Sequence, residues 1–99
     1  MDDSNPVASN LQMFFGDEDE DAVAVQELSL QLGRHPDSAR DLREAWDEVL
    51  RRRDADAARS LVEDFANRDV QGSGHRALDW LATIYEQLEP LWRSVGRQS

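Results

Sequence analysis

Apolar residues recur at intervals of three and four along most of the chain, which is the spacing of amphipathic helices. The clearest example is RALDWLATIYEQLEPLWRSV, residues 76–95. Its apolar stripe consists of Ala77, Leu81, Ile84, Leu88, Leu91 and Val95, widened by Leu78, Tyr85 and Trp92. Ser73 is a candidate N-terminal cap, and Pro90 predicts a kink near Leu88 or Glu89 because proline cannot donate a backbone hydrogen bond.

Residues 37–53, DSARDLREAWDEVLRRR, predict a second helix that starts at Pro36 and Asp37 and ends in three arginines. Its apolar stripe consists of Ala39, Leu42, Trp46, Val49 and Leu50. Asp47 with Arg51 and Glu48 with Arg52 are pairs with the acid first, four residues apart. Asp54 should then cap a short helix over residues 55–67, whose inward positions are Ala58, Leu61, Val62 and Phe65. So short a connection predicts an antiparallel hairpin of these two helices.

The first third of the chain is ambiguous, because residues 22–32 alternate like a strand while Val25, Leu28 and Leu32 fit a helix. We favour a helix, since acids precede it, Gly33 suits its C-terminus, and no other segment offers a strand to pair with. Residues 9–15 predict one or two further turns that bury Leu11, Phe14 and Phe15. The expected fold is all-α, a compact bundle of four to five helices. Its single domain covers residues 10–95, with flexible ends at 1–9 and 96–99.

Composition limits the class of protein. The chain has 99 residues, 39% hydrophobic and 32% charged, as expected for one small globular domain. It has no cysteine, so disulfides and thiolate metal sites are excluded. The acidic start differs from a signal peptide, and no apolar run is long enough for a membrane span. These features predict a cytoplasmic protein that does not associate with membranes.

Negative charge is concentrated at one end of the sequence. Of the formal net charge of −10, residues 1–33 contribute −8, with eight acids and no Lys or Arg, while the other 66 residues contribute −2, with 13 acids and 11 Arg. Such a field opposes direct binding of nucleic acid and favours a basic protein partner.

The sequence lacks the complete residue pattern of a metal site or a catalytic site. Asp17, Asp19 and Asp21 match three positions of a calcium loop, but its glycine and its bidentate glutamate are replaced by Ala22 and Leu28. His35 and His75 have no nucleophile at a useful spacing, and no catalytic motif occurs. We therefore expect no metal, no cofactor, no catalytic residue and no enzymatic activity.

The three tryptophans are candidates for either the core or an interface. Trp46 and Trp80 fall on or beside the apolar stripes, which favours the core. Trp92 follows the predicted kink and is a candidate interface aromatic as much as a core residue.

Three segments resemble a known family. NLQMFFG, LREAWDEVL and RALDWLATIYEQL, in this order, are similar to small immunity proteins of bacterial contact-dependent growth inhibition systems, over residues 10–88. In this resemblance Phe14 and Phe15 match the opening aromatics, residues 17–21 fall near the acidic segment, and Trp80 and Leu81 match the C-terminal signature. The family has a His and an Asp-Trp after the aromatic pair, where this chain continues directly with Gly16 and the acids. The resemblance implies a helical bundle that binds and neutralises a cognate toxin domain.

Charge and resemblance together predict an immunity protein that binds a basic, nuclease-type toxin. The candidate toxin-binding residues are Asp17, Glu18, Asp19, Glu20, Asp21 and Glu27, with Trp92 as a candidate interface aromatic. Two alternatives stay open. The acids could be only a solvated helix start. The protein could also be a helical adaptor or regulatory subunit that forms homodimers through the stripe over residues 77–95. The oligomeric state is not predicted.

Overall fold

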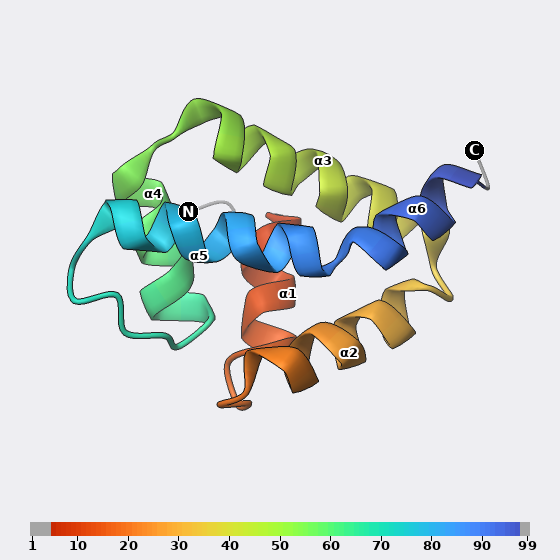
Figure 1. Ribbon diagram of the computed structural model, residues 1–99, viewed down its shortest axis with the longest axis horizontal. Helices are drawn as coiled ribbons and strands as arrows, with labels where there is room; N and C mark the ends of the chain where they lie inside the picture. The colour runs from red at the N-terminus through yellow and green to blue at the C-terminus, as the bar shows by residue number, and fades with distance from the viewer. Residues whose placement is uncertain (1–4, 98–99) are drawn as a thin grey trace.

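Figure 1 shows the chain as a computed structural model, which describes residues 5–97. This part of the chain is helical and contains no strand. In chain order the elements are α1 (Pro6–Phe14), α2 (Asp21–Leu32), α3 (Pro36–Arg52), α4 (Ala55–Ser60), the π-helical turn η1 (Leu61–Phe65), α5 (Gly74–Gln87) and α6 (Glu89–Arg97). The predicted all-α bundle and the predicted helix over residues 22–32 are both confirmed.

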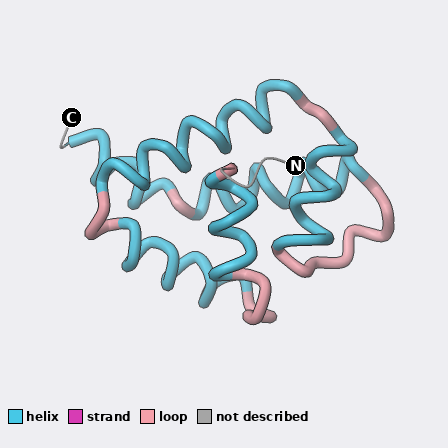
Figure 2. Tube along the Cα trace, turned by 180° about the vertical axis from the view of Figure 1, so that it is seen from behind, coloured by secondary structure: helices cyan, strands magenta, loops and turns pink. Residues whose placement is uncertain are grey.

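The helices form one rounded body of 38 × 27 × 24 Å. α3 and α5 run along its long axis in opposite directions, and α6 continues beyond the end of α5 (Figure 1). α1 crosses behind this pair, as the reverse view shows (Figure 2), and packs on η1, α3 and α2. α2 closes the remaining side, and each helix is too short or too polar to traverse a lipid bilayer within the described chain.

Side-chain caps set where three of the helices begin. Asn5 Oδ1 accepts the amide of Val7 at 2.9 Å at the start of α1. Asp54 Oδ1 accepts the amide of Ala57 at 3.2 Å, and Ser73 Oγ accepts that of Arg76 at 3.3 Å. Each oxygen satisfies an amide that has no partner inside its helix. The caps predicted for Asp54 and Ser73 are therefore confirmed.

The predicted kink at Pro90 is a full break between two helices. α5 ends at Gln87, and the amide of Leu88 donates to the carbonyls of Ile84 and Tyr85. Pro90 lies at the second position of α6, where its missing amide costs nothing. The break explains why residues 5–97 form six α-helices where the sequence predicted four or five.

The domain starts earlier than the sequence predicted. Asn5 and Pro6 form a cap followed by a first-turn proline, and the helix they start buries Val7 and Ala8. Residues 5–9 therefore belong to the folded domain, contrary to the predicted flexible segment 1–9. At the other end α6 runs to Arg97, two residues into the predicted flexible tail. Residues 1–4 and 98–99 lie outside the described chain.

Most of the predicted stripes of α3 and α5 lies in the core, which also contains two of the tryptophans. Four stripe residues, Val49, Leu50, Leu78 and Tyr85, are only partly buried against it, and the side chain of Val95 lies outside the described residues. Trp46 is fully buried and donates its indole Nε1–H to the carbonyl of Leu81 at 3.0 Å. Trp92 is only 3% exposed and donates to the carbonyl of Tyr85 at 3.0 Å. Of the two positions left open for Trp92, core and interface, it occupies the core, because the break at Leu88 turns α6 so that this indole packs inward. Phe14 and Phe65, predicted to be buried, are partly exposed at the edge of the core.

Two local predictions around the end of α3 are wrong. Arg53 adopts a left-handed conformation with φ 52°, and the chain then leaves α3 so that α4 packs on α5 and η1. No antiparallel hairpin of α3 and α4 forms, because the turn at Arg53 directs α4 away. Arg51 pairs with Glu48 and not with Asp47, whereas the predicted pair of Glu48 and Arg52 is present at 2.6 Å.

Candidate interaction surface

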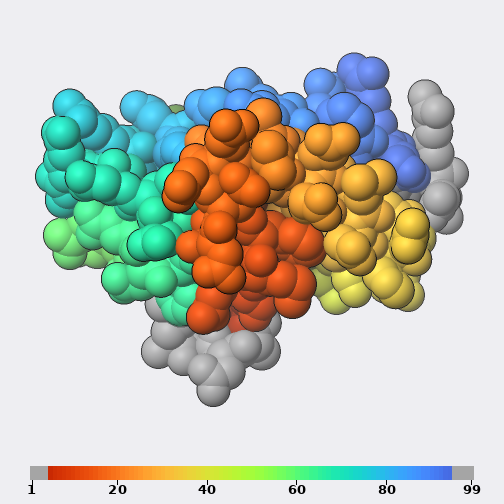
Figure 3. Space-filling view, turned by 90° about the horizontal axis from the view of Figure 1, so that it is seen from below, coloured from red at the N-terminus to blue at the C-terminus, as the bar shows by residue number. Residues whose placement is uncertain are grey.

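The acidic run forms the loop between α1 and α2 and the first residue of α2. Asp17, Asp19 and Glu20 are exposed, and Glu18 is half-buried. In the space-filling view from below, this orange segment lies at the centre of the face, next to the teal segment that follows η1 (Figure 3). The predicted acidic surface is thus a short loop seated on a second part of the chain.

A single arginine, Arg68, holds this loop. Its Nε donates to Asp21 Oδ1 at 2.8 Å, and its Nη1 donates to the carbonyls of Phe15 and Ala66, both at 3.0 Å. Its Nη2 donates to the carbonyl of Glu18, and its guanidinium carbon lies 5.6 Å from the centre of the Phe15 ring. The Arg68 side chain is only 15% exposed. One guanidinium therefore fixes both ends and the middle of the loop.

The backbone after α4 places Arg68 in this position. At η1 the amide of Ala66 donates to Leu61 five residues back, at 3.1 Å, and that of Arg68 donates to Val62 at 3.0 Å. Asn67 follows in the left-handed region with φ 57°, and its Nδ2 donates to the carbonyl of Gly16 at 3.4 Å. The wide turn thus presents its C-terminal end to the acidic loop.

Asp21 differs from the other predicted binding residues. Its Oδ1 accepts from Arg68, and its Oδ2 accepts the indole Nε1–H of Trp80 at 3.0 Å. Trp80 in turn packs edge-on against Phe15, with ring centres 5.2 Å apart. Both carboxylate oxygens of Asp21 therefore serve the fold, as does the half-buried Trp80.

The remaining predicted acids have no counter-charge within the described chain. They are Asp17, Glu18, Asp19, Glu20 and Glu27, and none of the ion pairs that the structure describes includes them. Glu18 makes one local contact, in which its Oε1 accepts the amide of Glu20 at 3.1 Å. The four loop carboxylates are consecutive in the chain, and unbalanced charges so close together produce a negative potential that attracts cations.

Arg68 is the site residue that sequence reasoning missed. It is the only basic residue between Arg59 and His75, and this isolation is a weak indication that it has a role in the fold. Its four hydrogen bonds reach mainly to residues about fifty positions earlier, and no local spacing encodes such contacts.

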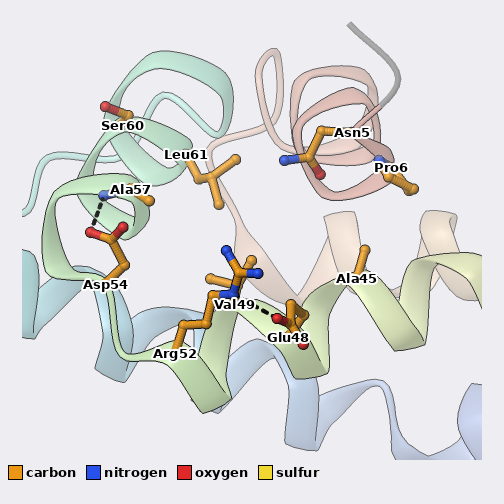
Figure 4. A pocket seen from close by; sticks show the side chains of 10 residues that line it. All are labelled: Asn5, Pro6, Ala45, Glu48, Val49, Arg52, Asp54, Ala57, Ser60 and Leu61. Atoms are coloured by element: carbon orange, nitrogen blue, oxygen red, sulfur yellow. Dashed lines mark hydrogen bonds and ion pairs between the residues drawn. The ribbon is translucent and has the colours of Figure 1, made fainter. Parts of the chain in front are cut away.

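A groove of about 590 Å³ lies between the start of α1, the second half of α3 and α4 (Figure 4). It is lined by Asn5, Pro6, Ala45, Glu48, Val49, Arg52, Asp54, Ala57, Ser60 and Leu61. Its charged groups are already engaged: Glu48 pairs with Arg51 and Arg52, and Asp54 caps α4. The groove is therefore mainly apolar, and the polar atoms of Glu48, Arg52 and Asp54 on its rim already have partners within the protein.

A smaller hollow lies where α3 meets α5 and α6, around Arg43 and Tyr85. Arg43 Nε donates to the Tyr85 hydroxyl at 3.4 Å, and this hydrogen bond raises the pKa of Arg43. Burial raises the pKa of Tyr85 above its ordinary value of 10.0. Among the side chains that the structure describes, no three His, Asp or Glu residues are grouped to hold a metal ion.

Among the described residues, the acidic loop and the apolar groove are candidate sites for a partner. Comparison of the chain with known protein families, with curated proteins and with solved structures finds no match.

Proposed function

We propose that this protein is a non-catalytic binding protein that neutralises a basic protein toxin, as do the immunity proteins its sequence resembles. One observation carries the proposal. The loop of residues 17–20 carries carboxylates that have no counter-charge among the described residues, while Arg68 fixes its backbone. A surface with uncompensated charge of one sign is complementary to a partner of the opposite sign.

The geometry supports a mechanism of stoichiometric inhibition. The negative field of the loop accelerates the encounter with a basic toxin. Because Arg68 already orders the backbone, binding loses less conformational entropy than it would with a free loop. A nuclease-type toxin needs a basic cleft for its phosphodiester substrate, and an acidic protein seated on that cleft excludes the substrate.

The alternative, a homodimeric adaptor, requires the apolar stripe over residues 77–95 to face a second copy. Within that stripe Ala77, Leu81 and Leu88 are fully buried in the monomer, and Ile84 and Leu91 are at most 3% exposed. These side chains already pack in the core. The buried stripe favours the toxin-binding proposal over this adaptor.

The decisive experiment is capture of the partner from the native host, followed by binding kinetics of the purified pair at low and high salt. The test variant is Asp17→Asn/Glu18→Gln/Asp19→Asn/Glu20→Gln. The matched control is Asp41→Asn/Glu44→Gln/Asp79→Asn/Glu86→Gln, which removes the same charge from exposed positions of α3 and α5.

We expect a basic protein at one-to-one stoichiometry. The loop variant should slow association about tenfold at low salt and reduce its salt dependence, whereas the control should have a much smaller effect. Equal slowing by both variants would contradict the assignment of the loop. Recovery of the protein alone, as a homodimer, would contradict the proposed function itself.

A further inference from the structure

The exposed large apolar side chains belong to the two helices that flank the acidic loop. In the part of the chain whose side chains are described, the large hydrophobic residues that reach the surface are Met13, Val23 and Leu30, at 70%, 36% and 58% exposure. All three lie between residues 13 and 30, in α1 and α2, on either side of the acidic loop. The rest of the described surface has no equivalent.

α2 is apolar on two faces. Ala24, Leu28 and Leu32 face the core and are buried. Val23, Glu27 and Leu30 follow one another at intervals of four and three, so they form one stripe along the outer face. The two sets together produce the near alternation of apolar and polar residues in the sequence of this helix.

We propose that the outer stripe of α2, formed by Val23, Glu27 and Leu30, is the docking face for a cationic amphipathic segment of a partner protein. Apolar side chains of that segment contact Val23 and Leu30, and its Lys or Arg residues pair with Glu27 and the loop acids. This inference rests on the proposed function and deepens it, because it names the residues that supply affinity where the acids supply rate.

Charge decides which occupant fits the stripe. A second copy of this chain would form a two-fold contact in which the same patch meets itself. Glu27 lies between the two apolar residues, so such a contact would bring together the Glu27 carboxylates of both copies. Like charges in contact are destabilising, whereas a cationic segment gains both the apolar and the electrostatic contacts.

The test uses two designed helical peptides as probes. One carries Lys on one face and Leu on the other, and the second has the same Lys residues with Leu replaced by Gln. Each is titrated into the full-length protein at low and high salt, and binding is mapped by amide chemical shifts. The test variant is Val23→Ser/Leu30→Ser, and the control is Thr83→Ser/Gln87→Ser on the exposed face of α5.

We expect the Leu-containing peptide to bind about tenfold more tightly than the Gln peptide, with shifts confined to residues 13–30. This difference should disappear in Val23→Ser/Leu30→Ser and persist in the control. The circular dichroism of the Ser variant should match that of the wild type and its urea midpoint should fall only slightly, because Leu30 is mostly exposed and Val23 is about one-third exposed.

The contrary outcomes separate the two proposals. If both peptides bind equally well at the acidic loop and the Ser variant changes nothing, the docking stripe is overturned and the acidic surface remains. If neither peptide binds, the docking stripe and the proposed function both fail. A wild-type dimer in sedimentation that becomes monomeric in the Ser variant would replace the cationic segment by a second copy.

Discussion

The acidic side of the molecule and the groove between α3 and α4 differ in whether their charged groups are paired and their leucines are buried. In the groove, Glu48 is shared by two arginines, and Leu61 is 3% exposed. On the acidic side, Arg68 satisfies backbone carbonyls and Asp21, so the loop acids stay unpaired and Leu30 is 58% exposed. A surface suited to a partner is thus recognised by what the fold leaves unsatisfied, and the size of a hollow is a poorer guide.

The largest expected difference between the two regions concerns their leucines. Leu61→Ala should lower the free energy of unfolding by about 2–5 kcal/mol, because it removes buried methyl groups and leaves a cavity. Leu30→Ala should change it by less than about 0.5 kcal/mol, because the side chain is mostly in water. Urea unfolding followed by tryptophan fluorescence measures both. A loss at Leu30 as large as that at Leu61 would show that the outer face of α2 is already covered.

The next prediction concerns Arg68. Arg68→Met should destabilise the protein by about 2–3 kcal/mol, because it leaves Asp21 and the carbonyls of Phe15 and Glu18 without their charged donor. Arg68→Lys should recover only part of this loss, since an ammonium cannot reach several acceptors in one plane. The measurement is the free energy of unfolding together with amide hydrogen exchange of residues 16–21. Unchanged hydrogen exchange in that loop would show that Arg68 does not hold it.

Asp21 and Glu48 offer a closer comparison, because each carboxylate accepts from two donors. Asp21→Asn should cost about 1–2 kcal/mol of unfolding free energy, since it weakens contacts with the largely buried Arg68 and with Trp80. Glu48→Gln should cost about 0.5 kcal/mol or less, because Arg51 and Arg52 are exposed and solvent screens the pairs. Thermal unfolding of both variants at low salt tests this order. Equal effects would mean that the burial of the arginine partner does not set the strength of the two ion pairs.

Tyr85 provides a reference outside both regions, and its expected effect is the smallest. Burial raises its pKa, so the folded state holds the phenolic proton more tightly than the unfolded state. This stabilisation is present below pH 10 and is lost as pH rises through the folded pKa. Tyr85 is the only tyrosine, so the phenolate absorbance reports it alone. We expect the midpoint of the phenolate titration to lie above 10.0 and to be the same in Glu48→Gln and in the loop variant. Tyr85→Phe is the control that should give no phenolate signal.

Periodicity was sufficient to predict the bundle, because the stripes of α3 and α5 are set by local spacing, and the caps at Asp54 and Ser73 are set by residues three apart. It was not sufficient for contacts between distant segments. Nothing in the acidic run distinguishes Asp21, which serves the fold, from its neighbours, since its partners Arg68 and Trp80 are 47 and 59 residues away. The burial of Trp92 likewise depends on how α6 packs after the break.

The π-helical turn at Leu61–Phe65 sets the direction in which Arg68 points relative to α4. Each residue advances an α-helix by about 100°, and a π-turn holds one residue more than an α-turn. Deleting one residue within the turn would restore the α register and rotate Arg68 by about that angle, away from the carbonyls it holds. The orientation of the acidic loop therefore depends on the length of a segment that lies outside the loop. Substitutions in the loop would change its charge, whereas insertions or deletions at η1 would change its orientation.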